Sequence, residues 1–136
     1  MWFNKSGKYD VYAPVNGKCI DIELVNDRTF AEKMLGDGVA IIPSNNVICS
    51  PADGEIIMLF NTLHAFGIRM KNGNELLIHI GIDTVELNGE GFTACKCLHE
   101  TVKKGQEIIR FDGDFMKKKN IDMTTMIVVT KQVGNT

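Results

Sequence analysis

The sequence predicts a mainly β protein, a single-domain β-sandwich or barrel with an internal duplication and short helical turns. Of the 136 residues, 44% are hydrophobic and 13 are glycine. No amphipathic run is longer than about ten residues, and one turn-and-strand pattern occurs twice. A chain of this length and apolar content can bury one hydrophobic core. We therefore expect one domain over residues 1–136, with its core at about 12–130.

The duplicated pattern is a Pro-x-x-Gly turn followed by a strand. Residues 13–20 (Ala-Pro-Val-Asn-Gly-Lys-Cys-Ile) match residues 50–57 (Ser-Pro-Ala-Asp-Gly-Glu-Ile-Ile), 37 residues later. Proline at the second turn position, a small or polar residue and glycine are typical of tight turns. Two similar halves suit a sandwich or barrel built from two related sheets. We expect a further turn and strand over residues 103–111 and a final strand over 121–129.

Between the two copies, residues 27–38 predict a short helical turn. Asp27 or Thr29 would be its N-cap and Gly36 would stop it. Phe30, Met34 and Leu35 fall on one side at helical spacing. Such a stripe is typical of core packing, and a contact surface is the alternative.

Residues 64–85 predict a β-hairpin that carries two of the three histidines. Asn72-Gly73 lies between two strand-like runs and predicts a two-residue turn. This register pairs Met70 with Glu75, Phe66 with His79, His64 with Gly81 and Thr62 with Asp83. The alternation of residues 76–83 places the aliphatic side chains on one face and His79 on the other.

In that register His64 and His79 become diagonal neighbours on one face, roughly 7–8 Å apart at the backbone. A slip of one residue would send the two side chains to opposite faces. Neighbouring histidines suit a metal site, an acid/base pair, or a nucleophilic imidazole assisted by a second one. A neutral imidazole is a competent nucleophile near neutral pH and can carry a phosphoryl group. The structural alternative is one packed histidine beside one exposed by chance.

Several segments then match one family. They are His64-Ala65-Phe66, residues 79–85 (His-Ile-Gly-Ile-Asp-Thr-Val), residues 87–92 (Leu-Asn-Gly-Glu-Gly-Phe) and residues 30–38. Together they resemble the glucose-type (type 1) enzyme IIA domain of the bacterial phosphoenolpyruvate-dependent sugar phosphotransferase system. The resemblance runs from about Tyr12 to Val129 and implies a fold of the duplicated hybrid motif type.

The resemblance implies a phosphocarrier, a phosphotransferase component of sugar uptake. His79 would accept a phosphoryl group from the phosphocarrier protein HPr and pass it to a cysteine on the IIB domain of a sugar-specific IIBC permease. His64 would support the phosphohistidine, Thr62 would orient His64, and Asp83 would contact the donor and act through its charge. A backbone carbonyl near Gly81 is expected to fix the tautomer of His79.

The resemblance also implies a shallow apolar surface for docking protein partners. Its expected members are Phe30, Met34, Leu35, Phe60, Phe66 and Val85. Asp37 is expected beside Asp83 in an acidic rim, which suits arginines on a basic donor protein. Regulatory proteins are further expected partners.

No cofactor is required for such a transfer, which relies on positioning and charge stabilisation. One alternative is a zinc-dependent hydrolase on a related duplicated β-scaffold, although Gly81 stands where a His-x-His pattern has its second ligand. Another is a regulatory binding module without transfer. A weak zinc site at His64 and His79 also stays open. Residues 95–99 (Cys-x-Cys-x-His) lack the spacing that zinc sites favour.

Charge and hydropathy exclude other classes. The net charge of −2 favours neither a nucleic-acid surface nor an anionic membrane. No apolar run approaches the roughly 18 residues of a membrane span, so we expect no direct membrane insertion. The four cysteines are few and unframed, which favours reduced thiols. The predicted location is cytoplasmic.

Overall fold

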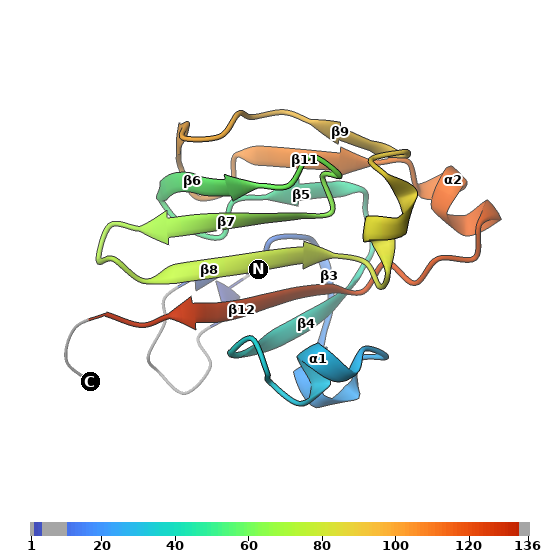
Figure 1. Ribbon diagram of the computed structural model, residues 1–136, viewed down its shortest axis with the longest axis horizontal. Coiled ribbons are helices and arrows are strands. Elements are labelled where there is room, and N and C mark those ends of the chain that lie inside the picture. The colour runs from blue at the N-terminus through green and yellow to red at the C-terminus, as the bar shows by residue number, and fades with distance from the viewer. Residues whose placement is uncertain (1, 4–10, 134–136) are drawn as a thin grey trace.

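The computed structural model describes residues 2–3 and 11–133, which form three antiparallel sheets and a few helical turns (Figure 1). Of the described residues, 42% are in strands and 14% in helices, which confirms the prediction of a mainly β fold. The predicted core over about 12–130 lies within the described part. Residues 1, 4–10 and 134–136 of the predicted domain lie outside it.

The strands are β1 (Trp2–Phe3), β2 (Val11–Tyr12), β3 (Gly17–Asp21), β4 (Asp37–Pro43), β5 (Val47–Cys49), β6 (Gly54–Leu59), β7 (Ala65–Met70), β8 (Glu75–Ile80), β9 (Phe92–Ala94), β10 (Thr101–Val102), β11 (Glu107–Phe111) and β12 (Thr125–Lys131). The helical turns are η2 (Ile22–Leu24), α1 (Arg28–Ala31), η3 (Thr84–Leu87) and α2 (Gly113–Lys118). The predicted turn and strand over 103–111 is confirmed by β11. The final strand begins and ends later than predicted.

The largest sheet has seven strands in the order β10-β6-β7-β8-β12-β4-β3. A three-stranded sheet, β5-β11-β9, packs on one of its faces, and β1 pairs with β2. Within the large sheet, β6-β7-β8 and β3-β4-β12 form two similar halves that meet where β8 pairs with β12. Each half begins at the glycine of one copy of the duplicated turn, Gly54 for β6 and Gly17 for β3.

Two reciprocal hydrogen bonds join the copies. The Tyr12 N–H donates to the Pro51 carbonyl at 2.9 Å, and the Cys49 N–H donates to the Pro14 carbonyl at 2.7 Å. A shift of 37 positions exchanges Tyr12 with Cys49 and Pro14 with Pro51, so the two bonds are equivalent under the repeat. The predicted internal duplication is therefore a local pseudo-twofold arrangement.

Two hydrophobic clusters lie on the two faces of the large sheet. The main cluster fills the space between the seven-stranded and three-stranded sheets and includes Ile41, Ile48, Phe66, Ile78, Ile80 and Ile109. The second cluster lies on the other face, between the sheet and the helical turns α1 and η2. It consists of Ile22, Val25, Phe30, Ala40, Met126 and Val128. Figure 1 shows α1 beneath β4 and β12. The short helical segment thus covers the face that the second sheet leaves open.

Helix α1 begins where the sequence predicts and ends earlier. The Asp27 carboxylate accepts a hydrogen bond from the Thr29 N–H at 2.9 Å, which confirms Asp27 as N-cap. The helix ends at Ala31 because the chain turns at Lys33, whose φ is 58°. Gly36 has a different role. A Cβ there would lie 2.1 Å from the Val129 carbonyl oxygen, so β12 can approach only a glycine.

The register of the β7–β8 hairpin differs from the prediction by one residue. The turn has three residues, Lys71 to Gly73, because Met70 pairs with Asn74 and not with Glu75. The Met70 N–H donates to the Asn74 carbonyl at 2.8 Å, and Gly73 takes a φ of 92°. Asn-Gly therefore marks the turn correctly without fixing its length.

The new register changes which residues face each other. Ala65 pairs with His79, and Phe66 pairs with Ile78. Phe66 consequently points into the main core and is 0% exposed. The prediction that Phe66 shares a face with His79 is wrong.

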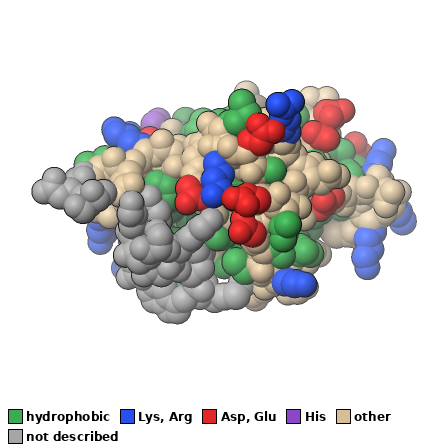
Figure 2. All heavy atoms as spheres, turned by 90° about the horizontal axis from the view of Figure 1, so that it is seen from below, with side chains coloured by type: hydrophobic (Ala, Val, Ile, Leu, Met, Phe, Trp, Pro, Cys, Tyr) green, Lys and Arg blue, Asp and Glu red, His purple; other side chains and the backbone are tan. Residues whose placement is uncertain are grey.

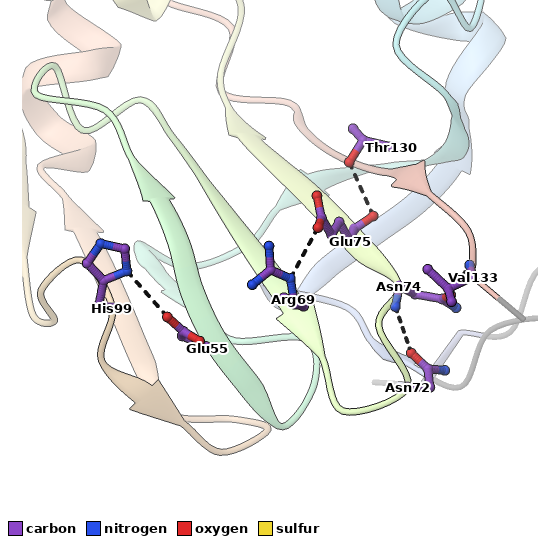
Figure 3. A network of polar contacts seen from close by, with 8 residues as sticks. All are labelled: Glu55, Arg69, Asn72, Asn74, Glu75, His99, Thr130 and Val133. Atoms are coloured by element: carbon purple, nitrogen blue, oxygen red, sulfur yellow. Dashed lines mark hydrogen bonds and ion pairs between the residues drawn. The ribbon is translucent and has the colours of Figure 1, made fainter.

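The end of β12 is fastened to this hairpin turn (Figure 3). The buried Asn74 accepts a hydrogen bond from the Val133 N–H at 2.8 Å through Oδ1. The Asn72 side chain caps the turn by accepting from the Asn74 N–H at 2.9 Å. Thr130 donates its hydroxyl to the Glu75 carbonyl at 3.3 Å. These hydrogen bonds attach the end of β12 to β8 and its turn, in addition to the backbone pairing of the two strands.

Replacing Asn74 with Ala is expected to lower the free energy of unfolding by about 1–3 kcal/mol, because it removes a buried hydrogen-bonded side chain. Urea denaturation measures the change. Asn72→Ala, which removes an exposed capping side chain, is the control and is expected to cost less. Equal losses in both variants would show that turn capping, and not the link to β12, stabilises this end.

Candidate functional site

Two imidazole rings meet at the end of the β7–β8 hairpin opposite its turn. The ring centroids of His64 and His79 lie 5.0 Å apart, and the ring planes are at 78°. His79 is on β8, between Ala65 of β7 and Met126 of β12. Both neighbours are fully buried, and Ala65 carries only a methyl group beside the ring. The predicted convergence of the two histidines is therefore observed.

His64 reaches this face although the register has slipped. It precedes β7 and lies in a bend after Leu63, whose φ is 57°, so the alternation of a strand does not govern it. Its backbone carbonyl still accepts from the Ile80 N–H at 2.7 Å. The ring is 5% exposed, and its Nδ1 lies 2.6 Å from the Thr62 hydroxyl oxygen. Thr62 thus lies where the resemblance implied.

The other ring has its own fixed partner. Nδ1 of His79 lies 3.0 Å from the Gly81 carbonyl oxygen, which has no proton to offer. Nδ1 must therefore carry the proton and donate it, which leaves Nε2 unprotonated in the neutral ring. Phe30 packs against the same imidazole, with ring centroids 4.8 Å apart. The site holds His79 in one tautomer and one orientation.

Burial favours the neutral form of both imidazoles. It lowers the pKa of His64 below its ordinary value of 6.5. It also lowers the pKa of His79, and the neighbouring His64 acts in the same direction. The hydrogen bond to the Gly81 carbonyl and the carboxylates of Asp27 and Asp83 partly oppose this shift. Asp27 is a charged neighbour that sequence reasoning placed only as a helix cap.

Four of the predicted docking residues have exposed apolar side chains, as a docking surface requires. They are Met34, Leu35, Phe60 and Val85. The Phe60 ring lies edge-on to His64, with centroids 5.0 Å apart. Met58, which the sequence did not single out, is exposed and pairs with Gly67 on the same face. A bulge in β6 between Ile56 and Met58 places it there and leaves no sequence signal.

The other two aromatic residues do not contribute to that surface. Phe66 is buried in the main core because Ala65, and not Phe66, pairs with His79. Phe30 is 3% exposed and belongs to the second cluster, so the alternative of core packing applies to it. Neither can offer contact area to a partner, and both predictions are corrected. Phe30 instead supports His79.

Asp37 does not lie beside Asp83. The strand registers place Asp37 level with Val129 and Leu76, near the start of β8, whereas Asp83 follows the end of β8. The Asp37 carboxylate forms an ion pair with Lys33 at 3.6 Å. Figure 2 shows acidic and basic side chains next to one another on the face seen from below. The acidic groups beside His79 are Asp27 and Asp83, and the predicted position of Asp37 is wrong.

Among residues 2–3 and 11–133, no three histidine, cysteine or acidic side chains are grouped so that they could hold a metal ion. His99 is exposed and lies 3.3 Å from the Glu55 carboxylate (Figure 3). The four cysteines are free thiols, as expected. None of the described helices has the length and hydropathy of a membrane span.

Comparisons with known proteins agree on one family. The family model described as "phosphoenolpyruvate-dependent sugar phosphotransferase system, EIIA 1" matches residues 9–134. The solved structure of glucose permease IIA from Mycoplasma capricolum is similar, with a TM-score of 0.87 and 40% identity, over 93% of this chain and 82% of that one.

Curated relatives point the same way. The glucose-specific EIIA component of Bacillus cereus is 46% identical over 127 residues, which are 93% of this chain and 77% of the relative. That of Haemophilus influenzae is 45% identical over 127 residues, 93% of this chain and 76% of the relative. The glucose-specific EIICBA component of Staphylococcus carnosus is 43% identical over 126 residues, 93% of this chain and 19% of that longer protein. The chain belongs to the glucose-type IIA family and is a phosphocarrier component of the sugar phosphotransferase system.

Proposed function

We propose that Nε2 of His79 is the atom that carries the phosphoryl group. The observation that supports this most is the hydrogen bond from Nδ1 to the Gly81 carbonyl, because it leaves the lone pair of Nε2 available. In uptake, a bond forms between Nε2 and the phosphorus while the bond from phosphorus to HPr breaks. In release, a cysteine thiolate of a IIB domain attacks the phosphorus, and the imidazole leaves.

His64 stabilises the phosphorylated state in this proposal. The Thr62 hydroxyl can donate to Nδ1 of His64, which then keeps its proton on Nε2. A proton there can be donated to a phosphoryl oxygen on the neighbouring ring. The short distance between the rings supports this role, since the added group needs a hydrogen-bond donor in a desolvated place.

The carboxylates near His79 favour transfer onward. Asp27 and Asp83 act on His79 through their charges. Once the imidazole carries a phosphate with further negative charge, the same carboxylates repel it. They attract basic side chains of the donor and destabilise the phosphohistidine when the donor leaves. Asp83 therefore contributes both contact and electrostatic pressure.

The exposed apolar surface is the proposed docking site for HPr and for IIB. Relatives named EIICBA components carry A, B and C parts in one name, which supports a IIBC permease as partner. Regulatory proteins are proposed to use the same surface. No cofactor is proposed for the transfer, and a zinc ion on His64 and His79 is the alternative. The cytoplasmic location stays a prediction.

Incubation with phosphoenolpyruvate, enzyme I and HPr is expected to add one acid-labile, base-stable phosphate. His79→Gln should abolish the labelling because it removes the nucleophile. His64→Gln should still take up phosphate but slow transfer to IIB by about 100-fold, the usual loss for one charge-stabilising donor. Radiolabelled phosphate followed through both steps measures this.

The matched control is His99→Gln, which removes the exposed histidine remote from the pair and should leave both steps unchanged. Full labelling of His79→Gln would overturn the assignment of the acceptor. Full two-way transfer by His64→Gln would overturn its supporting role. Loss of labelling with a chelator would favour the zinc alternative.

The double substitution of Met34 and Leu35 by Ala is expected to raise the KM for phosphorylated HPr about tenfold, because two exposed apolar contacts are lost. The kcat should change little, since neither side chain touches the imidazoles. Steady-state kinetics separate the two constants. Leu98→Ala, an exposed apolar residue elsewhere, is the control. An equal KM in both variants would place docking outside this surface.

The lowered pKa values of both histidines predict a pH-dependent stability. Below pH 6.5 the unfolded chain binds protons on these rings more readily than the folded chain. The stability that the two neutral histidines contribute to the folded state is therefore fully present above pH 6.5. It is lost as the pH falls towards their pKa values in the folded protein. Urea denaturation across this pH range measures the effect. The free energy of unfolding should fall less steeply with decreasing pH in the double variant His64→Gln, His79→Gln than in the wild-type protein. An unchanged slope would contradict the shifts.

A further inference from the structure

The peptide group between Gly81 and Ile82 is held at both ends. The Gly81 carbonyl accepts from Nδ1 of His79, and the Ile82 N–H on the same peptide donates to the Asp122 carbonyl at 2.8 Å. The bond is trans, so its C=O and N–H point in opposite directions in one plane. The direction of the carbonyl that orients His79 is therefore set from the far side by the backbone before β12.

The preceding peptide group is held in the same way. The Gly81 N–H donates to the Thr124 carbonyl at 3.1 Å. At the other end, the Ile80 carbonyl accepts from the Thr84 hydroxyl at 2.5 Å. The two planes meet at Gly81, whose φ of 83° suits a residue without a side chain.

Thr84 is the one side chain, apart from His79 itself, in these four hydrogen bonds. The other partners are backbone carbonyls, which any residue would supply. Thr84 is 1% exposed, and its methyl carbon lies 2.5 Å from where a Cβ on Gly81 would be. Its methyl group thus fills the space that glycine leaves, and its hydroxyl reaches the Ile80 carbonyl. Residue 84 therefore acts on the Ile80–Gly81 peptide through its side chain, whereas residues 122 and 124 act on Gly81 and Ile82 through their backbone carbonyls.

We propose that Thr84 is a positioning residue for phosphoryl transfer. Its hydroxyl holds the Ile80–Gly81 peptide so that the next carbonyl, that of Gly81, accepts the hydrogen bond from Nδ1 of His79. Thr84 touches no transferred group and acts through Gly81. The inference rests on the proposed function of His79, and it adds the residue that keeps the reactive nitrogen unprotonated.

The test compares Thr84→Val, which has nearly the same shape without the hydroxyl, with Thr84→Ser, which keeps it. Nitrogen-15 NMR of the His79 ring above neutral pH reports which nitrogen carries the proton. Thr84→Val is expected to populate the Nε2-protonated tautomer and to slow phosphorylation by HPr about tenfold, the effect of one ordinary hydrogen bond. Thr84→Ser should keep the wild-type tautomer and rate.

Ser50→Ala is the matched control. Ser50 is also 1% exposed and donates its hydroxyl to a backbone carbonyl, that of Ala52, at 2.7 Å, in the duplicated turn. It should lose stability without a change in the His79 tautomer. If Thr84→Val fails to fold, Thr84→Ala against Thr84→Ser isolates the same hydroxyl.

Two results would overturn the inference. One is a Thr84→Val protein with the wild-type tautomer and rate, and the other is a Thr84→Ser protein altered as much as Thr84→Val. Failure of wild-type protein to take up phosphate on His79 would instead reject the proposed function. The tautomer measurement would still decide what Thr84 does, because it needs no phosphate donor.

Discussion

The site depends on the pairing of β8 with β12, where the two halves of the large sheet meet. This pairing places His79 beside Met126 in a fully bonded part of the sheet. Backbone carbonyls just before β12 then accept hydrogen bonds from the N–H groups of Gly81 and Ile82. The imidazole that we propose as the phosphoryl carrier is therefore positioned by strand pairing and by backbone hydrogen bonds. A rigid support suits a group that must meet two different protein partners in turn.

The same constraint explains the electrostatics. A ring in the middle of a packed sheet loses solvation, so the neutral form, which the proposed nucleophile requires, is favoured. In the proposed function, phosphorylation of His79 adds negative charge near Asp27 and Asp83. Burial favours acceptance of the group, and the nearby carboxylates favour its release. A carrier needs both, because the phosphoryl group must remain close in free energy on donor, carrier and acceptor.

The sequence predicts the chemistry of the site better than its register. The duplicated turns, the face of His79, the Gly81 carbonyl and the Thr62 contact all follow from local pattern or from the resemblance. The hairpin register does not, because Asn-Gly fits a two-residue and a three-residue turn equally well. His64 still reaches His79 because Leu63 turns the chain before β7 begins. The position of Asp37 depends on the register between strands that are distant in the sequence, and the position of Met58 depends on a bulge in β6. A single sequence does not encode either feature locally.

The position of β12 has a consequence for biosynthesis. It is the last strand among the described residues, yet it lies inside the sheet, with β8 on one side and β4 on the other (Figure 1). Until residues 125–131 have left the ribosome, β4 and β8 each present an unpaired edge, and the two halves of the sheet cannot close. Folding of the domain is thus coupled to the completion of its synthesis. A nascent chain stalled before this strand would expose two unpaired strand edges, and its His79 would lack Met126 as a neighbour.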